Sequence, residues 1–167
     1  MRRRKALLAA AAGLAFVGTA PALAECADPG RPGVEWRNCL LDGQDFAGVD
    51  LSGATLRDSS FNRADLSKAK LARINGYGVK FLSAKLVGAV LDDARLEAAD
   101  FTKADLTGAS LKNADLRRAV LFRATLKNAN LSGAQLRETE LSFADLTGAT
   151  WIDGKTVCGP ESIGKCR

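Results

Sequence analysis

The sequence contains no histidine, and it has only one methionine and one tyrosine among its 167 residues. Without histidine, the catalytic triads and dyads that depend on an imidazole base are excluded. Histidine is also a common ligand of protein-bound metal ions, so its absence leaves few ways to build a metal site. The sequence further lacks the Gly-Gly-x-Gly-x-Asp repeats that bind calcium. We therefore expect a protein that is not an enzyme and that carries no catalytic residue, cofactor or metal ion.

Long apolar runs are also scarce, and the one that stands out, residues 6–17, is broken only by Gly13. A run of about a dozen residues is too short to span a bilayer, which needs a segment of roughly 20. The run follows the basic residues 2–5 and precedes Ala22-Leu23-Ala24, an order that is typical of a secretory signal peptide. We expect cleavage after Ala24, removal of residues 1–24, and a periplasmic or secreted chain without a membrane span.

Two other kinds of export signal fit the sequence less well. Lipidation requires a cysteine directly after the small-residue site, but Cys26 follows Glu25. A twin-arginine signal beginning at Arg2-Arg3 stays open, although the residues after it fit that motif poorly. A secretory signal and a twin-arginine signal both direct a chain out of the cytoplasm.

The mature chain has no excess of charge of one sign. The whole sequence carries 24 Lys and Arg and 19 Asp and Glu, a net charge of +5. Residues 1–24 contain four basic residues and no acidic one, so their removal leaves 20 basic and 19 acidic residues, a net charge of +1. This balance favours neither a nucleic-acid-binding protein nor an acidic mimic of nucleic acid.

Cysteine occurs only four times, at Cys26, Cys39, Cys158 and Cys166. An even number of cysteines in an exported protein indicates disulfide bonds. Three pairings are possible. If the segment between them is a rod, its ends lie far apart, and the local pairs Cys26–Cys39 and Cys158–Cys166 are by far the easiest to form. The wide spacings give little support to a metal site.

What the sequence does contain is a repeat of five residues. From Leu41 to Trp151 every fifth residue is apolar, and only Gly76 breaks the rule. Two residues earlier in each unit the residue is small, and between positions 54 and 149 it is Ala in 16 of 20 units. A period of five fits neither an α-helix nor a flat strand. It predicts a coil in which every side turns one Leu or Phe and one Ala toward a common axis.

The units follow the pattern A-[DN]-L-x-x, as in Ala64-Asp65-Leu66-Ser67-Lys68 and Ala144-Asp145-Leu146-Thr147-Gly148. Over roughly residues 41–151 the chain resembles the pentapeptide-repeat family. The resemblance implies an all-β, right-handed quadrilateral parallel β-helix, a solenoid of about five to six coils with four units in each. Residues twenty apart would then stack, and Phe61, Phe81 and Phe101 would form a ladder inside one side.

The predicted organisation has four parts. A signal peptide over 1–24 is followed by an N-terminal cap over 25–40, the β-helix over 41–151 and a C-terminal cap over 152–167. A solenoid leaves apolar columns and unpaired edges at its ends, so both ends need covering. The only two tryptophans, Trp36 and Trp151, lie beside the expected disulfide loops at these ends.

One irregularity interrupts the repeat, where Gly76 takes the place of a leucine. The two nearest small-residue sites hold Ile74 and Val79 in place of Ala, which predicts that the larger side chains fill the missing volume. The alternative is a kink or recognition loop that presents Tyr77.

Counting in twenties assigns the outward positions to sides and yields a candidate interaction patch. Leu82 and Phe122 fall in one outward column two coils apart, and Val120 and Phe143 fall close by on the same side. Exposed apolar residues gathered on one side suggest a binding surface, whereas scattered ones are common on any protein. Another side carries arginines interspersed with Asp and Glu, which predicts a solvated ion-pair lattice.

These observations favour a non-enzymatic binding or scaffold module outside the cytoplasm, which presents a rigid surface to a protein partner or to a second copy, and not to nucleic acid. The resemblance offers an alternative, because some pentapeptide-repeat proteins mimic DNA and protect topoisomerases. Those members are cytoplasmic and acidic, whereas this chain has an export signal, four cysteines and a mature charge near zero.

Overall fold

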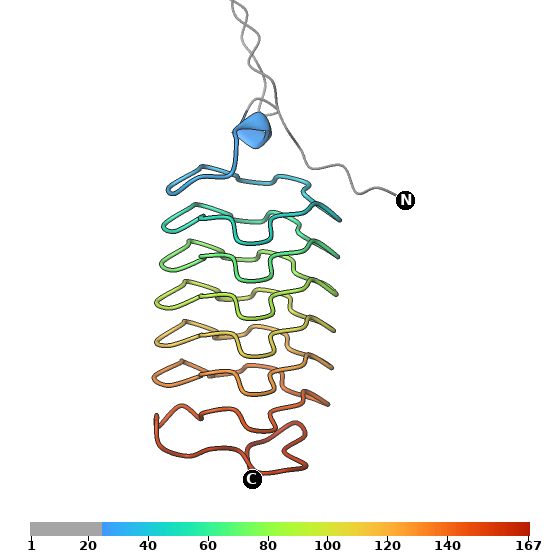
Figure 1. The fold of residues 1–167 in the computed structure, drawn as a ribbon, viewed down its shortest axis with the longest axis vertical. Coiled ribbons are helices and arrows are strands. Elements are labelled where there is room, and N and C mark those ends of the chain that lie inside the picture. Colours follow the sequence, from blue (N-terminus) through green and yellow to red (C-terminus); the bar gives the residue numbers. More distant parts are fainter. Residues whose placement is uncertain (1–24) are drawn as a thin grey trace, which may run out of the picture.

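The structure is a computed structural model. It describes residues 25–167, which form a rod of stacked coils (Figure 1). The expected signal peptide over 1–24 lies outside the described residues. A short 3-10 helix, η1 (Glu25–Ala27), precedes the first coil and is the only helix in the described part of the chain. No helix within residues 25–167 has the length and apolar character needed to cross a membrane.

Single-residue parallel bridges join each coil to the next. They connect residues twenty positions apart, from Glu35 with Thr55 to Asn130 with Thr150, and they recur every fifth residue. Each coil of twenty residues therefore has four bridged sides, and the solenoid predicted from the repeat is confirmed. Hydrogen bonds run between coils in both directions: the leucine N–H donates to the next coil, as from Leu106 to the Thr125 carbonyl at 2.7 Å, and the Thr125 N–H donates back to the Ala104 carbonyl at 2.9 Å. The corner residue also donates to the next coil, as from Gly108 to the Lys127 carbonyl at 2.8 Å.

The sides are not continuous strands, although the pairing is of the β type. Within residues 25–167 each bridged residue stands alone between two turns. The second residue after the leucine has a positive φ, for example 57° at Lys103 and 65° at Gly108. This left-handed conformation turns the corner of the coil, and glycine adopts it without the steric cost that other residues pay.

The core consists of the two inward columns that the repeat predicts. The Leu or Phe of each unit and the small residue two positions earlier are fully buried along most of the rod. Phe61, Phe81 and Phe101 stack with ring centroids 5.5 and 5.0 Å apart. Trp36 continues this aromatic series toward the first coil, with its ring centroid 6.3 Å from that of Phe61.

The coil is unbroken at Gly76. Gly76 N–H donates to the Arg95 carbonyl at 2.8 Å, and Asn75 keeps its bridge to Arg95. A β-carbon placed on Gly76 would lie 3.1 Å from a Leu96 methyl and 3.1 Å from a Val79 methyl. Neighbouring side chains therefore occupy the space of the missing leucine, as the volume argument predicts.

Disulfides fasten both ends of the rod. Cys26 pairs with Cys39 and Cys158 pairs with Cys166, which is the local pairing. Cys39 is fully buried in the inner column of small residues, at the position that Ala99 and Ala119 occupy in later coils, so the first disulfide ties η1 to the core. At the other end the chain turns back and pairs antiparallel with the last coil, through Val157 with Thr150 and Ile163 with Asp145.

Candidate interaction surface

The side of the rod that contains Phe61, Phe81 and Phe101 in its interior is called the phenylalanine side. The first residue after each inward Leu or Phe on this side faces outward, and the stacking of coils aligns these residues in a column. From the first coil to the last, the column contains Asp42, Asn62, Leu82, Thr102, Phe122 and Ser142. The two candidate residues Leu82 and Phe122 therefore share one column, as the twenty-residue spacing predicts.

Phe122 and Phe143 come together near the C-terminal end of the phenylalanine side. Their ring centroids are 5.7 Å apart at 86°, an edge-to-face arrangement that aromatic pairs favour. Phe143 is 64% exposed although it is a large apolar residue. It stands at a coil corner with a φ of 60°. The two residues are called the aromatic pair.

Arg123 completes this surface, and the sequence analysis did not select it. Its guanidinium carbon lies 5.2 Å from the Phe122 ring centroid and 5.8 Å from that of Phe143. A guanidinium at this range is attracted to the face of an aromatic ring. The signal was available in the sequence, because Arg123 and Phe143 are twenty residues apart and so occupy the same corner of successive coils.

Of the other two candidate residues, Leu82 lies apart from the aromatic pair and Val120 lies two residues before Phe122. Leu82 is 39% exposed and lies two coils, or about 10 Å, from Phe122, with Thr102 between them. Val120 is half-buried and is bridged to Asp100 and Glu140 in the neighbouring coils. The structure thus brings two of the four candidate residues into contact and leaves Leu82 as a separate exposed side chain.

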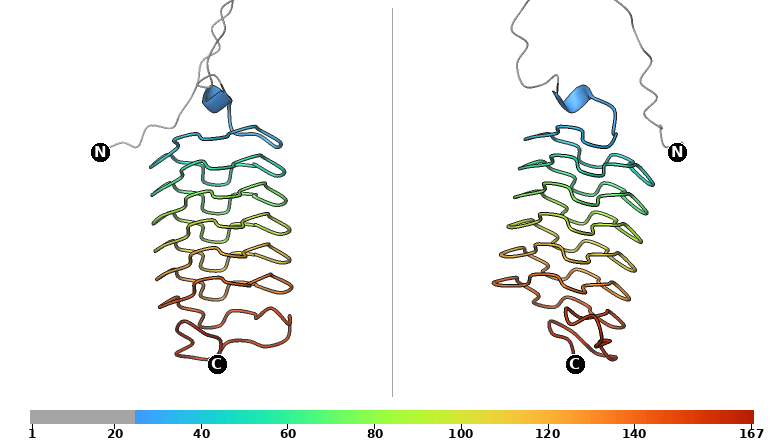
Figure 2. Two further views of the ribbon diagram at one scale, coloured as in Figure 1. Left: turned by 180° about the vertical axis from the view of Figure 1, so that it is seen from behind. Right: turned by 90° about the vertical axis from the view of Figure 1, so that its left-hand side faces the viewer.

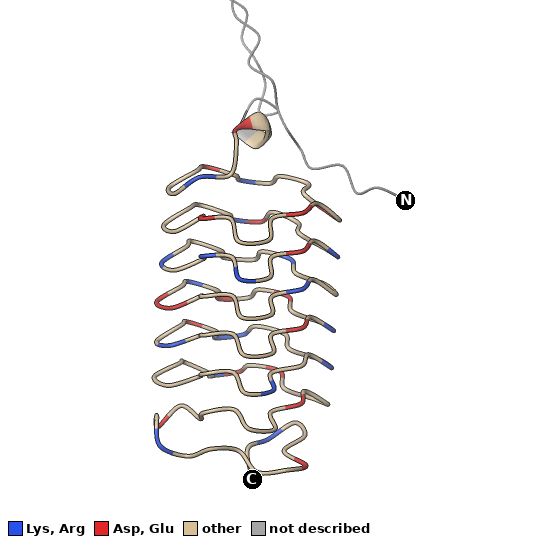
Figure 3. Cartoon of the chain, in the orientation of Figure 1, with Lys and Arg blue, Asp and Glu red and all other residues tan. Residues whose placement is uncertain are grey.

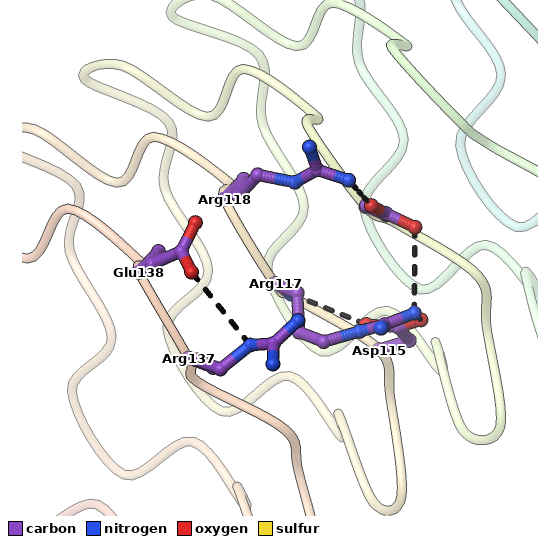
Figure 4. A network of polar contacts seen from close by, with 6 residues as sticks. Asp115, Arg117, Arg118, Arg137 and Glu138 are labelled. Atoms are coloured by element: carbon purple, nitrogen blue, oxygen red, sulfur yellow. Dashed lines mark hydrogen bonds and ion pairs between the residues drawn. The ribbon is translucent and has the colours of Figure 1, made fainter.

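A second side, called the arginine side, carries a charged network (Figure 4). Arg117 binds Asp115 at 2.6 Å and Glu97 at 3.3 Å, Arg118 also binds Glu97, and Arg137 lies 3.7 Å from Glu138. The hydrogen bond from Arg117 holds the pKa of Asp115 below its ordinary value, even though partial burial acts in the opposite direction. The pKa of Arg117 is raised by the same contact.

The charged groups of this network pair with one another. Glu97 and Asp115 accept from Arg117 and Arg118, so these guanidinium groups already have acidic partners. Basic and acidic residues are also interspersed elsewhere on the rod (Figure 3). Exposed pairs of this kind contribute about 0–1 kcal/mol each. The arginine side is thus an ion-pair lattice, and the aromatic pair remains the stronger candidate for binding.

The described residues contain no group of three or more Cys, Asp or Glu side chains placed to hold a metal ion. All four cysteines are in disulfides.

Comparison with known proteins identifies the repeat. The family model for pentapeptide repeats, with eight copies, matches residues 37–73, 77–113 and 114–150. A comparison with curated proteins gives no match. Similar solved structures include HetL, a pentapeptide repeat protein involved in heterocyst differentiation regulation in the cyanobacterium Nostoc sp. strain PCC 7120. It is 33% identical over 75% of this chain, with a TM-score of 0.47. The match spans 62% of the length of HetL.

Two further solved structures show the range of the likeness. Rfr23, a pentapeptide repeat protein from the cyanobacterium Cyanothece 51142, is 28% identical over 70% of this chain and 90% of its own, with a TM-score of 0.44. QnrB1, a plasmid-mediated fluoroquinolone resistance protein, is 20% identical over 75% of this chain and 79% of its own, with a TM-score of 0.38.

Proposed function

Because the chain belongs to the pentapeptide-repeat family, we propose that it is a non-enzymatic binding or scaffold module that presents a rigid β-helix surface to a protein partner. The proposal includes a right-handed helix of about five to six coils over residues 41–151, between a cap at 25–40 and a cap at 152–167. It also includes export through the signal peptide at 1–24, and action in the bacterial periplasm or outside the cell.

The aromatic pair is the observation that carries this proposal. Phe143 exposes 64% of its surface on a rod whose outward positions are mostly polar. Aromatic residues and arginine are enriched at protein interfaces and among the residues that contribute most to binding. Phe122, Phe143 and Arg123 supply both kinds of residue in one cluster.

The disulfides support the proposed location. Structural disulfides persist in oxidising compartments such as the periplasm and the extracellular space, and they are rare in the cytosol. Two local disulfides at the ends of the rod therefore suit an exported protein.

The alternative of a DNA mimic that protects topoisomerases gains no support from the surface. Such mimicry needs a negative field, whereas the expected mature chain has 20 basic and 19 acidic residues. Charges of both signs are also interspersed over the coils (Figure 3). Detection of the uncleaved chain in the cytosol with reduced thiols would return this alternative to consideration.

The proposal is tested by crosslinking in the native compartment with the wild type, Phe122→Asp and Ser132→Asp. Ser132 lies ten residues after Phe122, on the opposite side of the coil, so its variant carries the same new charge away from the aromatic pair. We expect the wild type and Ser132→Asp to crosslink to the same protein. Phe122→Asp should lower the yield at least about tenfold, the effect of losing one important interface residue.

Solution mass, measured for the same three proteins, detects a second copy as the partner. Folding of each variant is checked by circular dichroism. Equal crosslinking yields and equal masses for all three proteins, or no specific crosslink for the wild type, would refute the proposed function.

A further inference from the structure

The backbone hydrogen bonds of the last coil differ from those of the coils before it. Along the rod, each coil supplies the acceptors and donors that its predecessor needs. Leu116 and Arg118, for example, donate to the carbonyls of Gln135 and Arg137 in the next coil, both at 3.0 Å. The coil that contains residues 134–151 has no further coil beneath it, so its lower edge must be satisfied in another way.

The C-terminal segment covers part of this edge. Leu146 donates to the Ser162 carbonyl at 2.9 Å, and Gly148 donates to the Cys158 carbonyl at 2.8 Å. Cys158 in turn donates to the Ala149 carbonyl at 2.8 Å. The segment curls beneath the last coil (Figure 2). It acts as a short extended chain added antiparallel to two of the four sides.

Two sides of this edge remain without a covering segment, and the one on the arginine side, residues 134–139, is called the open edge. Within the described chain, no hydrogen bond is made by the N–H groups of Leu136 and Glu138 or by the carbonyls of Ala134 and Thr139. The same four groups one coil earlier are all bonded: the N–H groups of Leu116 and Arg118, and the carbonyls of Ala114 and Ala119.

The open edge also exposes part of the core. Leu136 is only half-buried, whereas Leu116, one coil earlier in the same column, is fully buried. Leu141 is half-buried as well. An occupant that completes this edge must therefore offer backbone donors and acceptors together with an apolar side chain. Arg137 and Glu138 flank the edge with opposite charges that pair with each other, so an uncharged occupant fits best.

We propose that the open edge binds an uncharged extended segment of the protein partner, which continues the coil by backbone hydrogen bonding and covers Leu136 with an apolar side chain. Addition of a strand to an unpaired edge is a general mode of peptide recognition. The C-terminal segment of this chain already occupies two other sides of the same coil, those of Leu146 and Trp151, in the same way. The inference rests on the proposed function and assigns the form in which the partner is recognised.

The first test uses hydrogen exchange of the disulfide-intact protein. In the free protein, the amides of Leu136 and Glu138 should exchange at least about 100-fold faster than those of Leu116 and Arg118, because only the latter are hydrogen-bonded. Eight-residue peptides are then selected from a displayed random library on the same protein. The selected peptides should slow exchange at Leu136 and Glu138 at least about tenfold.

The second test changes the peptide and leaves the protein intact. N-methylation of the peptide residues whose N–H groups face Ala134 and Thr139 should abolish binding, and N-methylation of the residues between them should not. On the protein, Leu136→Lys should lower peptide affinity at least about tenfold, because a lysine on an edge strand opposes pairing. Val87→Lys, which places the same charge on an exposed apolar site elsewhere, should leave the affinity unchanged.

The outcomes separate this inference from the proposed function. Peptides that lose affinity for Phe122→Asp but give no protection at Leu136 and Glu138 would leave the proposed function intact and overturn the inference. Protection that rises with protein concentration in the absence of peptide would identify a second copy as the occupant and would also overturn it. A selection without any peptide that protects these two amides has the same consequence.

Discussion

At the scale of the residue, Gly76 shows how the core exchanges volume between neighbours. Ile74 and Val79 are fully buried at positions where most units have alanine. Methyl groups of Val79 and Leu96 lie next to the position that a β-carbon of residue 76 would occupy. We expect Gly76→Leu to overpack this space and to lower the free energy of unfolding by about 1–3 kcal/mol. The triple variant with Ile74→Ala and Val79→Ala restores the usual pattern of the repeat and should recover much of that loss. Chemical denaturation measures the free energy of unfolding of both variants.

If Gly76→Leu instead stabilised the protein, the coil would have an unfilled cavity there and the account of volume exchange would be wrong. Tyr77 does not lie in a loop that departs from the regular coil. Its ring packs 5.1 Å from the Arg57 guanidinium carbon, and the bridges on both sides of it are regular.

A single carboxylate at the start of the C-terminal cap has a strongly altered pKa. Hydrogen bonds from the Thr156 hydroxyl and from the N–H groups of Lys155 and Thr156 lower the pKa of Asp153 to about 2. Because the folded pKa is depressed, the contribution of this group to stability is present above pH 4 and is lost as the pH falls toward 2. Carboxyl NMR titration should give a midpoint near 2 for the wild type.

Thr156→Val removes the largest cause, so it should raise that midpoint toward the ordinary value of about 4. Thr125→Val makes the same change at a threonine that does not bond to Asp153, and it serves as the control. An unchanged midpoint in Thr156→Val would show that the hydroxyl does not hold the carboxylate.

At the scale of the element, the N-terminal cap depends on a cysteine that has replaced an alanine of the inner column. Cys39 is fully buried in that column, where later coils have Ala99 and Ala119. The double variant Cys26→Ala and Cys39→Ala therefore removes the disulfide without overfilling the core. We expect a loss of about 3 kcal/mol in the free energy of unfolding, since the bond closes a loop of 13 residues in the unfolded chain.

Denaturant titration under non-reducing conditions measures this loss, and addition of a reductant to the wild type should reproduce it. A double variant as stable as the wild type would mean that η1 is held by packing alone.

The elements were predictable to different degrees for physical reasons. The inward columns follow from the period of five, because burial of one Leu and one Ala per side leaves a direct mark on the sequence. The left-handed corners at residues such as Lys103 and Arg118 do not follow from this period, since only glycine and asparagine indicate that conformation by residue type. The antiparallel return of residues 157–163 has no repeat of its own, so the sequence indicated through Trp151 and the cysteines that the end is covered, but not how the covering segment pairs.

The candidate site was predictable where it depends on register. Counting in twenties placed Phe122 and Phe143 on neighbouring coils, and their rings do meet. It also placed Leu82 in the same column, but residues that share a column and differ by two coils are about 10 Å apart and need not touch. Arg123 was missed because a charged residue at a corner resembles any other solvated charge, although its spacing of twenty residues from Phe143 already placed it beside one of the two rings that it contacts.

At the scale of the whole molecule, the rod behaves as a one-dimensional array in which each unit contacts mainly its own coil and the two adjacent coils. The unit of the array is the side of five residues, and the coil of twenty follows from four such sides. An insertion of one complete unit should therefore be absorbed into the helix. It shifts every later residue by one side while each inward column stays apolar. An insertion of any length that is not a multiple of five cannot be absorbed, because it would turn polar residues inward.

This distinction gives a final prediction. A second copy of residues 104–108 placed after Gly108 should fold into the coil, and its added leucine amide should be as protected from hydrogen exchange as that of Leu106, which is bonded to Thr125. The insertion separates Glu97 from Arg117 and Arg118, so stability should fall by no more than about 2 kcal/mol from lost ion pairs. The matched four-residue insertion, without the glycine, should be expelled as a loop with an unprotected leucine. Fast exchange of the added leucine in both variants would show that the four-sided coil, and not the five-residue side, is the smallest unit that this fold accepts.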